Sequence, residues 1–328
     1  MQAPRFWYQP KGLRSKLFAP LGALYAAGTT RKLAQGAREN VGVPVICIGN
    51  LTAGGTGKTP TVIAVLMMLA ARGVTAHVVS RGYGGSLEGP VQVKEREHKA
   101  DQVGDEPLLL AAFAPTWVAK NRAEGARAAV AAGAEVILLD DGFQNASLAY
   151  DLSLVVVDAT RGFGNGAVIP AGPLREPVEA GLARADLVIS IGPAPAQRSF
   201  VGQWGAALTV PLVSGVLRPL ETGIAFSGMR VLAFAGIGHP AKFFATLKAL
   251  GAEVVRGEAL SDHQPLSDAL MARLTREAKL LGAQLVTTEK DAVRLPDALR
   301  REVLTVPVRL EIAHPDALDA ALDQVLKT

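Results

Sequence analysis

The chain has 328 residues, of which 49% are hydrophobic and only 5% aromatic. This length exceeds the usual size of one domain and allows a sizeable core, so the composition indicates an α/β protein of two domains. The single cysteine, Cys47, excludes an internal disulfide. Because Cys47 lies within an apolar run, we interpret it as core packing in a reducing compartment.

The net charge of +4 is unevenly distributed along the chain. Residues 1–38 contain seven Lys and Arg and no acidic residue, whereas the remainder has 27 basic and 30 acidic residues. A nucleic-acid-binding protein more often spreads basic residues over a reading surface. The charge therefore predicts no nucleic-acid partner and sets the N-terminal segment apart.

Residues 1–38 combine aromatic, leucine and basic residues. The apolar run Leu17–Ala27 is eleven residues long and contains Pro20, whereas a helix that spans a bilayer needs about 20 residues. Leucines and aromatics between cations are typical of a segment that lies on a membrane surface, which we predict here. Two alternatives are a helix packed on its own domain and a cleaved signal peptide.

The most informative stretch is 44–61, where a short apolar strand, a glycine-rich loop and a helix-compatible run follow one another. Such a loop exposes backbone N–H groups that wrap polyphosphate oxygens, with the helix N-terminus directed at the anion. Lys58 then reaches the β- and γ-phosphates, and Thr59 reaches Mg²⁺. The predicted ligands are therefore ATP and Mg²⁺, although a chance glycine-rich turn is the alternative. The predicted nucleotide-binding residues are Thr52, Ala53, Gly54, Gly55, Thr56, Gly57, Lys58 and Thr59.

Short, almost wholly apolar segments alternate with helical patterns as far as residue 192. Strands buried on both faces form a parallel sheet covered by helices, and their carboxyl ends gather polar residues at one edge. The predicted strands are Val45–Ile48, Thr75–Val79, Thr116–Ala119, Val136–Leu139, Leu154–Val157 and Leu187–Ile191. The predicted helices are Thr61–Arg72, Pro107–Ala114 and Arg122–Ala132.

Asp140 and Asp141 follow one of these strands. Two buried adjacent acids are costly without a cation, so we predict that they hold Mg²⁺ beside the phosphate loop.

Other candidates lie in loops and keep two interpretations each. Arg81 and Tyr83 belong to a glycine-rich loop that either contacts the substrate or forms a plain turn. Asp105 precedes a helix and is a cap or a catalytic group. The pair Arg175 and Glu176 lies between prolines, in a connector or at the phosphates. His263 lies in a polar loop, where most histidines have no catalytic role.

The alternation of predicted strands and helices stops after residue 192 and resumes near residue 231. We predict an interfacial segment at 1–38, a phosphate-loop kinase domain at 39–210, a linker at 211–226 and a smaller α/β domain at 227–328. Residues 287–291 do not match the Asn-Lys-x-Asp motif, so GTP specificity is not predicted.

Taken together, these motifs closely resemble the tetraacyldisaccharide 4′-kinase family, which also has Thr in place of the first glycine of the phosphate loop. The matching segments cover most of the chain: 49–60, 80–84, 103–107, 140–144, 161–166, 173–177 and 288–291.

The resemblance implies ATP-dependent phosphorylation of the 4′-hydroxyl of a tetraacylated glucosamine disaccharide 1-phosphate in lipid A synthesis. It also implies a location at the cytoplasmic face of a Gram-negative inner membrane. We expect no obligate protein partner. Within the family, residues matching Asp105 and His263 act together in catalysis, and those matching Arg175 and Glu176 lie at the phosphates and metal.

Two other functions compete with this one. A kinase or synthetase acting on a small metabolite would work without lipid or detergent and would tolerate loss of residues 5–27. An ATP-driven switch would hydrolyse nucleotide on contact with a partner protein and would yield no phosphorylated lipid.

Overall fold

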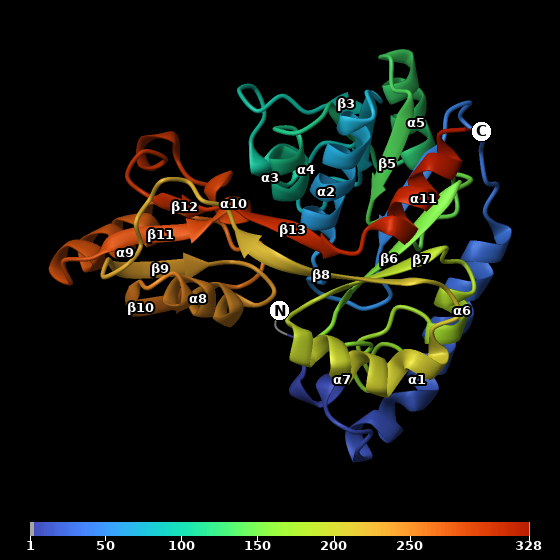
Figure 1. Ribbon diagram of the computed structural model, residues 1–328, viewed down its shortest axis with the longest axis horizontal. Helices are drawn as coiled ribbons and strands as arrows, with labels where there is room; N and C mark the ends of the chain where they lie inside the picture. The colour runs from blue at the N-terminus through green and yellow to red at the C-terminus, as the bar shows by residue number, and fades with distance from the viewer. Residues whose placement is uncertain (1–2, 328) are drawn as a thin grey trace.

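The computed structural model describes residues 3–327 and contains two sheets (Figure 1). The larger sheet has nine strands in the order β13-β8-β7-β6-β1-β5-β2-β4-β3, parallel except for β3 and β13 at its edges. Its strands are β1 Val45–Gly49, β2 Ala76–Ser80, β3 Val91–Gln92, β4 Thr116–Val118, β5 Val136–Asp140, β6 Leu152–Asp158, β7 Leu187–Ile191, β8 Leu212–Pro219 and β13 Val308–Ala313. The predicted parallel sheet covered by helices is confirmed.

The central strands are buried on both faces, which explains their unbroken apolar sequences. Ile46 and Ile48 of β1 share a core with α2 and α11, whereas Val45 and Cys47 face clusters that include α5 and α7. The helices around this sheet are α2 Lys58–Ala71, α3 Ala100–Val103, α4 Asp105–Leu110, α5 Arg122–Ala131, α6 Val178–Leu182, α7 Ala194–Trp204 and α11 Asp316–Val325.

The smaller sheet is wholly parallel, in the order β10-β9-β11-β12. Helix α9 packs on Leu232 and Phe234 of β9, and α8 packs on the alternate residues Val231 and Ala233, so the two helices cover opposite faces. Its elements are β9 Arg230–Ala235, α8 Pro240–Ala249, β10 Glu253–Ala259, α9 Asp268–Leu280, β11 Gln284–Thr288, α10 Glu289–Ala292 and β12 Leu304–Val306. Short 3₁₀ turns span Arg5–Tyr8, Gly205–Ala207 and Asp297–Leu299.

Helix α1 (Leu13–Gln35) runs along the edge of the larger unit and continues through Pro20 (Figure 1). Among residues 3–327, no helix is both long and apolar enough to span a bilayer. Ser15 anchors α1, since its hydroxyl donates to the Ala171 carbonyl (2.9 Å). On the opposite side of α1, several leucine side chains are exposed to solvent.

The chain crosses between the two units differently from the predicted boundaries. Residues 211–226, predicted as a linker, include β8, which pairs with β7 in the larger sheet. After the smaller sheet the chain returns, because β13 pairs with β8 and α11 buries Leu318 and Leu322 in the larger core. The smaller unit is therefore inserted between β8 and β13 of the larger unit.

Candidate active site

A side-chain hydrogen bond within the loop between β1 and α2 stabilises its conformation. The Asn50 side-chain amide donates to the Thr56 hydroxyl (3.2 Å) across the loop. Gly57 has φ +98°, and a Cβ there would lie 2.6 Å from Cδ1 of Ile191. Only glycine therefore fits at the position where the loop enters α2.

A second segment is hydrogen-bonded to this loop through the backbone. The Ala53 N–H donates to the Pro173 carbonyl and the Arg175 N–H donates to the Leu51 carbonyl, both at 2.7 Å. Thr52 also pairs with Leu174 in an antiparallel bridge. These bonds hold Arg175 beside the phosphate loop, although the two lie more than 100 residues apart in the sequence.

Asp141 is paired with cations. Arg175 Nη1 lies 3.0 and 3.1 Å from its two carboxylate oxygens, and Lys58 Nζ lies 3.6 Å from Oδ1. Although burial opposes ionisation, the positive charges of Lys58 and Arg175 hold the pKa of Asp141 below its ordinary value. Asp141 therefore orients the two cations that face the predicted phosphate site.

Asp140 has a different environment. Only 1% of the residue is exposed; Oδ2 accepts from Ser80 (3.3 Å), while Oδ1 has no hydrogen-bond partner among the described residues. Burial and the negative charge of Glu106 raise the pKa of Asp140 to about 7. An unpartnered buried carboxylate oxygen suits a cation.

The donor set fits Mg²⁺, which binds through one or two carboxylates together with substrate phosphates and waters. Asp140 and the buried Thr59 hydroxyl are the protein donors that fit best here. Within residues 3–327, no group of three or more His, Cys, Asp or Glu side chains is arranged to hold a metal without such phosphates.

Glu176 is held by other side chains. Its Oε1 accepts from Gln144 (2.9 Å) and its Oε2 is paired with Arg184. In this arrangement Glu176 orients Gln144, whose carbonyl oxygen accepts from Arg175 (3.0 Å). The predicted contact of Glu176 with the metal stays a prediction.

A second cluster joins the two units. Asp105 begins α4 of the larger unit, and its Oδ1 and Oδ2 lie 3.0 and 2.9 Å from Nδ1 of His263, which follows β10 of the smaller unit. Burial opposes ionisation of Asp105, but its hydrogen bond to His263 and the charge of Lys290 hold the pKa of Asp105 below its ordinary value. Arg294 Nε lies 3.7 Å from the same carboxylate.

The loop after β2 carries the two predicted substrate residues. Tyr83 is 68% exposed, and its ring packs edge-on against His263 with centroids 5.4 Å apart. Arg81 is also exposed. Tyr83 therefore lies beside the Asp105–His263 pair, on its solvent side, and the substrate role of both residues stays a prediction.

Several residues in these clusters were not predicted as site residues, among them Gln144, Lys290 and Arg122. Gln144 links Arg175 to Glu176, and Lys290 bonds Glu106 across the two units (3.0 Å). Arg122 is buried, and its Nε has no hydrogen-bond partner in the described part of the chain; burial and the charge of Arg81 lower the pKa of Arg122. Gln144 and Lys290 lie within motifs that the sequence analysis identified, but a motif does not indicate which partner each side chain has.

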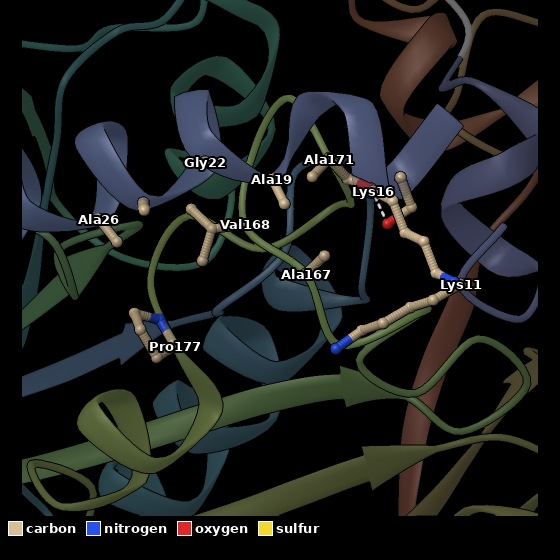
Figure 2. A pocket seen from close by; sticks show the side chains of 11 residues that line it. Lys11, Lys16, Ala19, Gly22, Ala26, Ala167, Val168, Ala171 and Pro177 are labelled. Atoms are coloured by element: carbon tan, nitrogen blue, oxygen red, sulfur yellow. Dashed lines mark hydrogen bonds between the residues drawn. The ribbon is translucent and has the colours of Figure 1, made fainter. Parts of the chain in front are cut away.

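A separate hollow of about 430 Å³ lies between α1 and residues 167–171 (Figure 2). Its walls are mainly alanine, glycine and Val168, and Lys11 and Lys16 lie together at one end (Figure 2). None of the predicted phosphate-binding residues lines it.

A parallel sheet with a phosphate loop after its central strand, a neighbouring strand ending in Asp140, and two cations at the loop define a P-loop phosphotransferase. The chain belongs to the family described as "Tetraacyldisaccharide-1-P 4'-kinase", whose model matches residues 14–327. It is thus a kinase, and the family predicted from the motifs is confirmed.

Individual relatives agree with this assignment. The chain is 64% identical over 326 residues to "Tetraacyldisaccharide 4'-kinase" of Jannaschia sp. (strain CCS1), covering 99% of both chains. It is 63% identical to the protein of the same name from Dinoroseobacter shibae, covering 98% of this chain and 97% of that one. A crystal structure of "apo" form LpxK from Aquifex aeolicus in complex with ATP shares the fold, with a TM-score of 0.76 at 24% identity over 96% of this chain and 100% of that one.

Proposed function

We propose that this kinase transfers the terminal phosphoryl group of ATP to the 4′-hydroxyl of a tetraacylated glucosamine disaccharide 1-phosphate. The observation that supports the proposal is the Asp105–His263 pair. It joins the phosphate-loop unit to the smaller unit in a chain that belongs to this kinase family. A carboxylate held by an imidazole is suited to accept a proton from a hydroxyl.

At the nucleotide, this chain supplies backbone N–H groups and two cations. The amides of residues 54–59 bind the phosphate oxygens, while Lys58 and Arg175 neutralise charge on the transferred group. Asp140 and Thr59 would hold Mg²⁺, which would supply positive charge to offset that of the phosphates. Asp141 keeps Lys58 and Arg175 in place by pairing with both.

At the acceptor, the sugar oxygen forms a bond to the γ-phosphorus as the bond from that phosphorus to the β–γ bridging oxygen breaks, releasing ADP. The hydroxyl proton passes to Asp105, and His263 orients the carboxylate. The lowered pKa keeps Asp105 ionised at neutral pH. A weak base suffices because phosphoryl transfer depends mostly on positioning and charge neutralisation. Tyr83 and Arg81 border the acceptor side.

We further propose that α1 rests on the cytoplasmic face of the inner membrane, where an acylated substrate resides. Its outward side exposes Leu13 (85%), Leu17 (72%), Leu21 (52%) and Leu24 (71%). These positions recur at helical spacing on one face, and Lys and Arg flank them, as in helices that lie at the lipid interface.

Incubation with ATP, Mg²⁺ and the disaccharide lipid tests the catalytic proposal. The product mass should rise by one phosphoryl group, and His263→Ala should lower kcat more than ATP affinity. His314→Ala is the matched control, because His314 also has a positive φ (54°) but is exposed between β13 and α11. Equal turnover in the two variants would contradict the role of His263.

Flotation with vesicles containing anionic phospholipid tests the membrane proposal. A variant with Asp at Leu17 and Leu24 should stay with the soluble fraction, because two carboxylates cannot enter the acyl boundary. The control is Leu280→Asp, since Leu280 is 80% exposed on α9. Flotation of the α1 variant equal to that of the control would contradict docking through this face.

A further inference from the structure

Lys290, in α10, directs its ammonium group into the junction between the two units. Its Nζ lies 3.0 Å from Oε1 of Glu106, 3.4 Å from Nε2 of His263 and 3.8 Å from Oδ1 of Asp262. The side chain is only 19% exposed. Lys290 therefore touches the imidazole on the nitrogen that Asp105 does not touch.

The contacts at the two ring nitrogens define where the proton lies. A carboxylate only accepts hydrogen bonds, so Nδ1 of His263 carries the proton that is donated to Asp105. An ammonium group only donates, so the Nε2 that faces Lys290 is the lone-pair nitrogen. Because the bond at one ring nitrogen fixes the state of the other, Lys290 and Asp105 select the same neutral tautomer.

Asp262 would favour a proton on Nε2 of His263 instead. Its Oδ1 lies 3.7 Å from Nε2 of His263 and would accept a proton from that nitrogen. Lys290 lies closer and also neutralises Asp262. A cationic imidazole would place a second positive charge 3.4 Å from the ammonium group, which like-charge repulsion disfavours.

The ammonium group itself remains charged. Burial opposes the charge, but Glu106, Asp105 and Asp262 hold the pKa of Lys290 above its ordinary value. Beside the Asp105–His263 pair, Arg294 faces Asp105 and Asp291 pairs with Arg294, while the titratable Tyr83 ring packs edge-on against His263.

We propose that Lys290 is a positioning residue that keeps His263 neutral and protonated on Nδ1, so that Asp105 remains the group that accepts the substrate proton. The inference rests on the proposed catalytic role of Asp105 and His263. Without the ammonium group, Asp262 would accept from Nε2, and the resulting imidazolium would pair with Asp105 and weaken it as a base.

The wild-type enzyme provides the first test. In ¹⁵N-histidine-labelled protein at pH 7.5, the His263 ring should show a protonated Nδ1 and an unprotonated Nε2, with the His263→Ala spectrum identifying its signals among the five histidines. A ring protonated on Nε2, or on both nitrogens, would overturn the inference whether or not any variant folds.

Lys290→Met provides the second test. At pH 7.5 its His263 ring should gain a proton on Nε2, and the acidic limb of the kcat profile should move to higher pH, because the charge of Lys290 no longer lowers the pKa of Asp105. Lys242→Met is the matched control, because Lys242 also forms an ion pair between the units, with Asp158 at 2.7 Å, but does not contact His263.

A Lys290→Met enzyme that keeps the wild-type tautomer, or that keeps the wild-type acidic limb, would overturn the inference. Failure of the underlying catalytic proposal is distinguishable. It would appear as wild-type turnover in His263→Ala, whereas the tautomer is read from spectra that do not depend on activity.

Discussion

Asp140 and Asp141 are neighbours in sequence with different partners. The sequence predicts both as magnesium ligands, because two adjacent acids at the end of a buried strand are costly without a cation. In the structure Asp141 pairs with Lys58 and Arg175, while one oxygen of Asp140 has no hydrogen-bond partner within the described residues. Asp140 is the last residue of β5, whereas Asp141 follows the strand with a positive φ (53°), so the two adjacent carboxylates have different surroundings.

Lys58→Ala should strongly lower phosphoryl transfer while leaving the fold intact. Removal of a preorganised charge at the transferred group costs roughly 10²–10³ in kcat. The fold should persist because Asp141 retains Arg175 as a partner. Transfer to the lipid and the urea unfolding midpoint measure the two effects. Lys279→Ala, at an exposed position of α9, controls for the loss of one charge. Wild-type turnover in Lys58→Ala would remove this lysine from the mechanism.

His239 provides a pH-dependent prediction for stability. Burial and the positive charge of Arg161 lower the pKa of His239 to about 4, and its Nε2 has no partner among residues 3–327. The unfolded chain, with an ordinary pKa near 6.5, binds this proton first. Above pH 6.5 the ring is neutral in both the folded and the unfolded chain, and the folded state keeps its full stability. As pH falls from 6.5 towards 4, protonation of the unfolded chain lowers the free energy of unfolding.

His239→Gln should accordingly show a smaller drop in Tm between pH 7.5 and pH 5 than the wild type, as measured by thermal unfolding at both pH values. His314→Gln, at an exposed histidine, should show the wild-type drop. An unchanged drop in His239→Gln would mean that this ring does not titrate with unfolding.

At the scale of elements, α1 is held by close contact as well as by hydrogen bonds. A Cβ on Gly22 would lie 2.8 Å from the Val168 carbonyl oxygen, whereas a Cβ on Gly28 would meet nothing within 4 Å. Both glycines lie inside the same helix. The helix therefore approaches residues 167–171 at Gly22 but not at Gly28.

Gly22→Ala should loosen α1, because a carbonyl oxygen of the backbone cannot move aside cheaply. Gly28→Ala should instead favour the helix by about 0.8–1 kcal/mol, the usual difference in propensity between the two residues. Limited proteolysis of α1 and the Tm distinguish them. Faster cleavage is expected only in Gly22→Ala, and equal cleavage of both variants would show that the close approach does not hold α1.

Sequence patterns predicted the elements of this fold better than their long-range pairing. Buried parallel strands such as Leu187–Ile191 are continuous apolar runs, so their positions are readable. The bond between His263 and Asp105 joins residues 158 apart, and no periodicity encodes such a pairing. The family resemblance, and not the spacing, indicated that these two residues act together.

The same limit applies to the whole molecule. Residues 308–325 have strand and helix patterns that suit either unit, and their place depends on which sheet has an open edge. The pairing of β13 with β8 attaches them to the larger sheet. The chain therefore crosses between the two units twice, and its C-terminal residues pack in the core of the larger unit, although the sequence predicted one linker at 211–226.

A protein ending at Pro307 should consequently fail to fold, although the break lies after the smaller sheet. The cut removes Leu318, Leu322 and Val325 from the larger core, and full burial of each such side chain contributes about 1.5–3 kcal/mol. That loss is comparable to the whole stability of a typical domain, about 5–15 kcal/mol. It also exposes β8 as an unpaired edge, which promotes aggregation. Urea unfolding followed by circular dichroism should show no cooperative transition, whereas a protein ending at Leu326 should unfold like the full chain. A cooperative wild-type transition in the shorter protein would show that the larger unit folds without its returning strand.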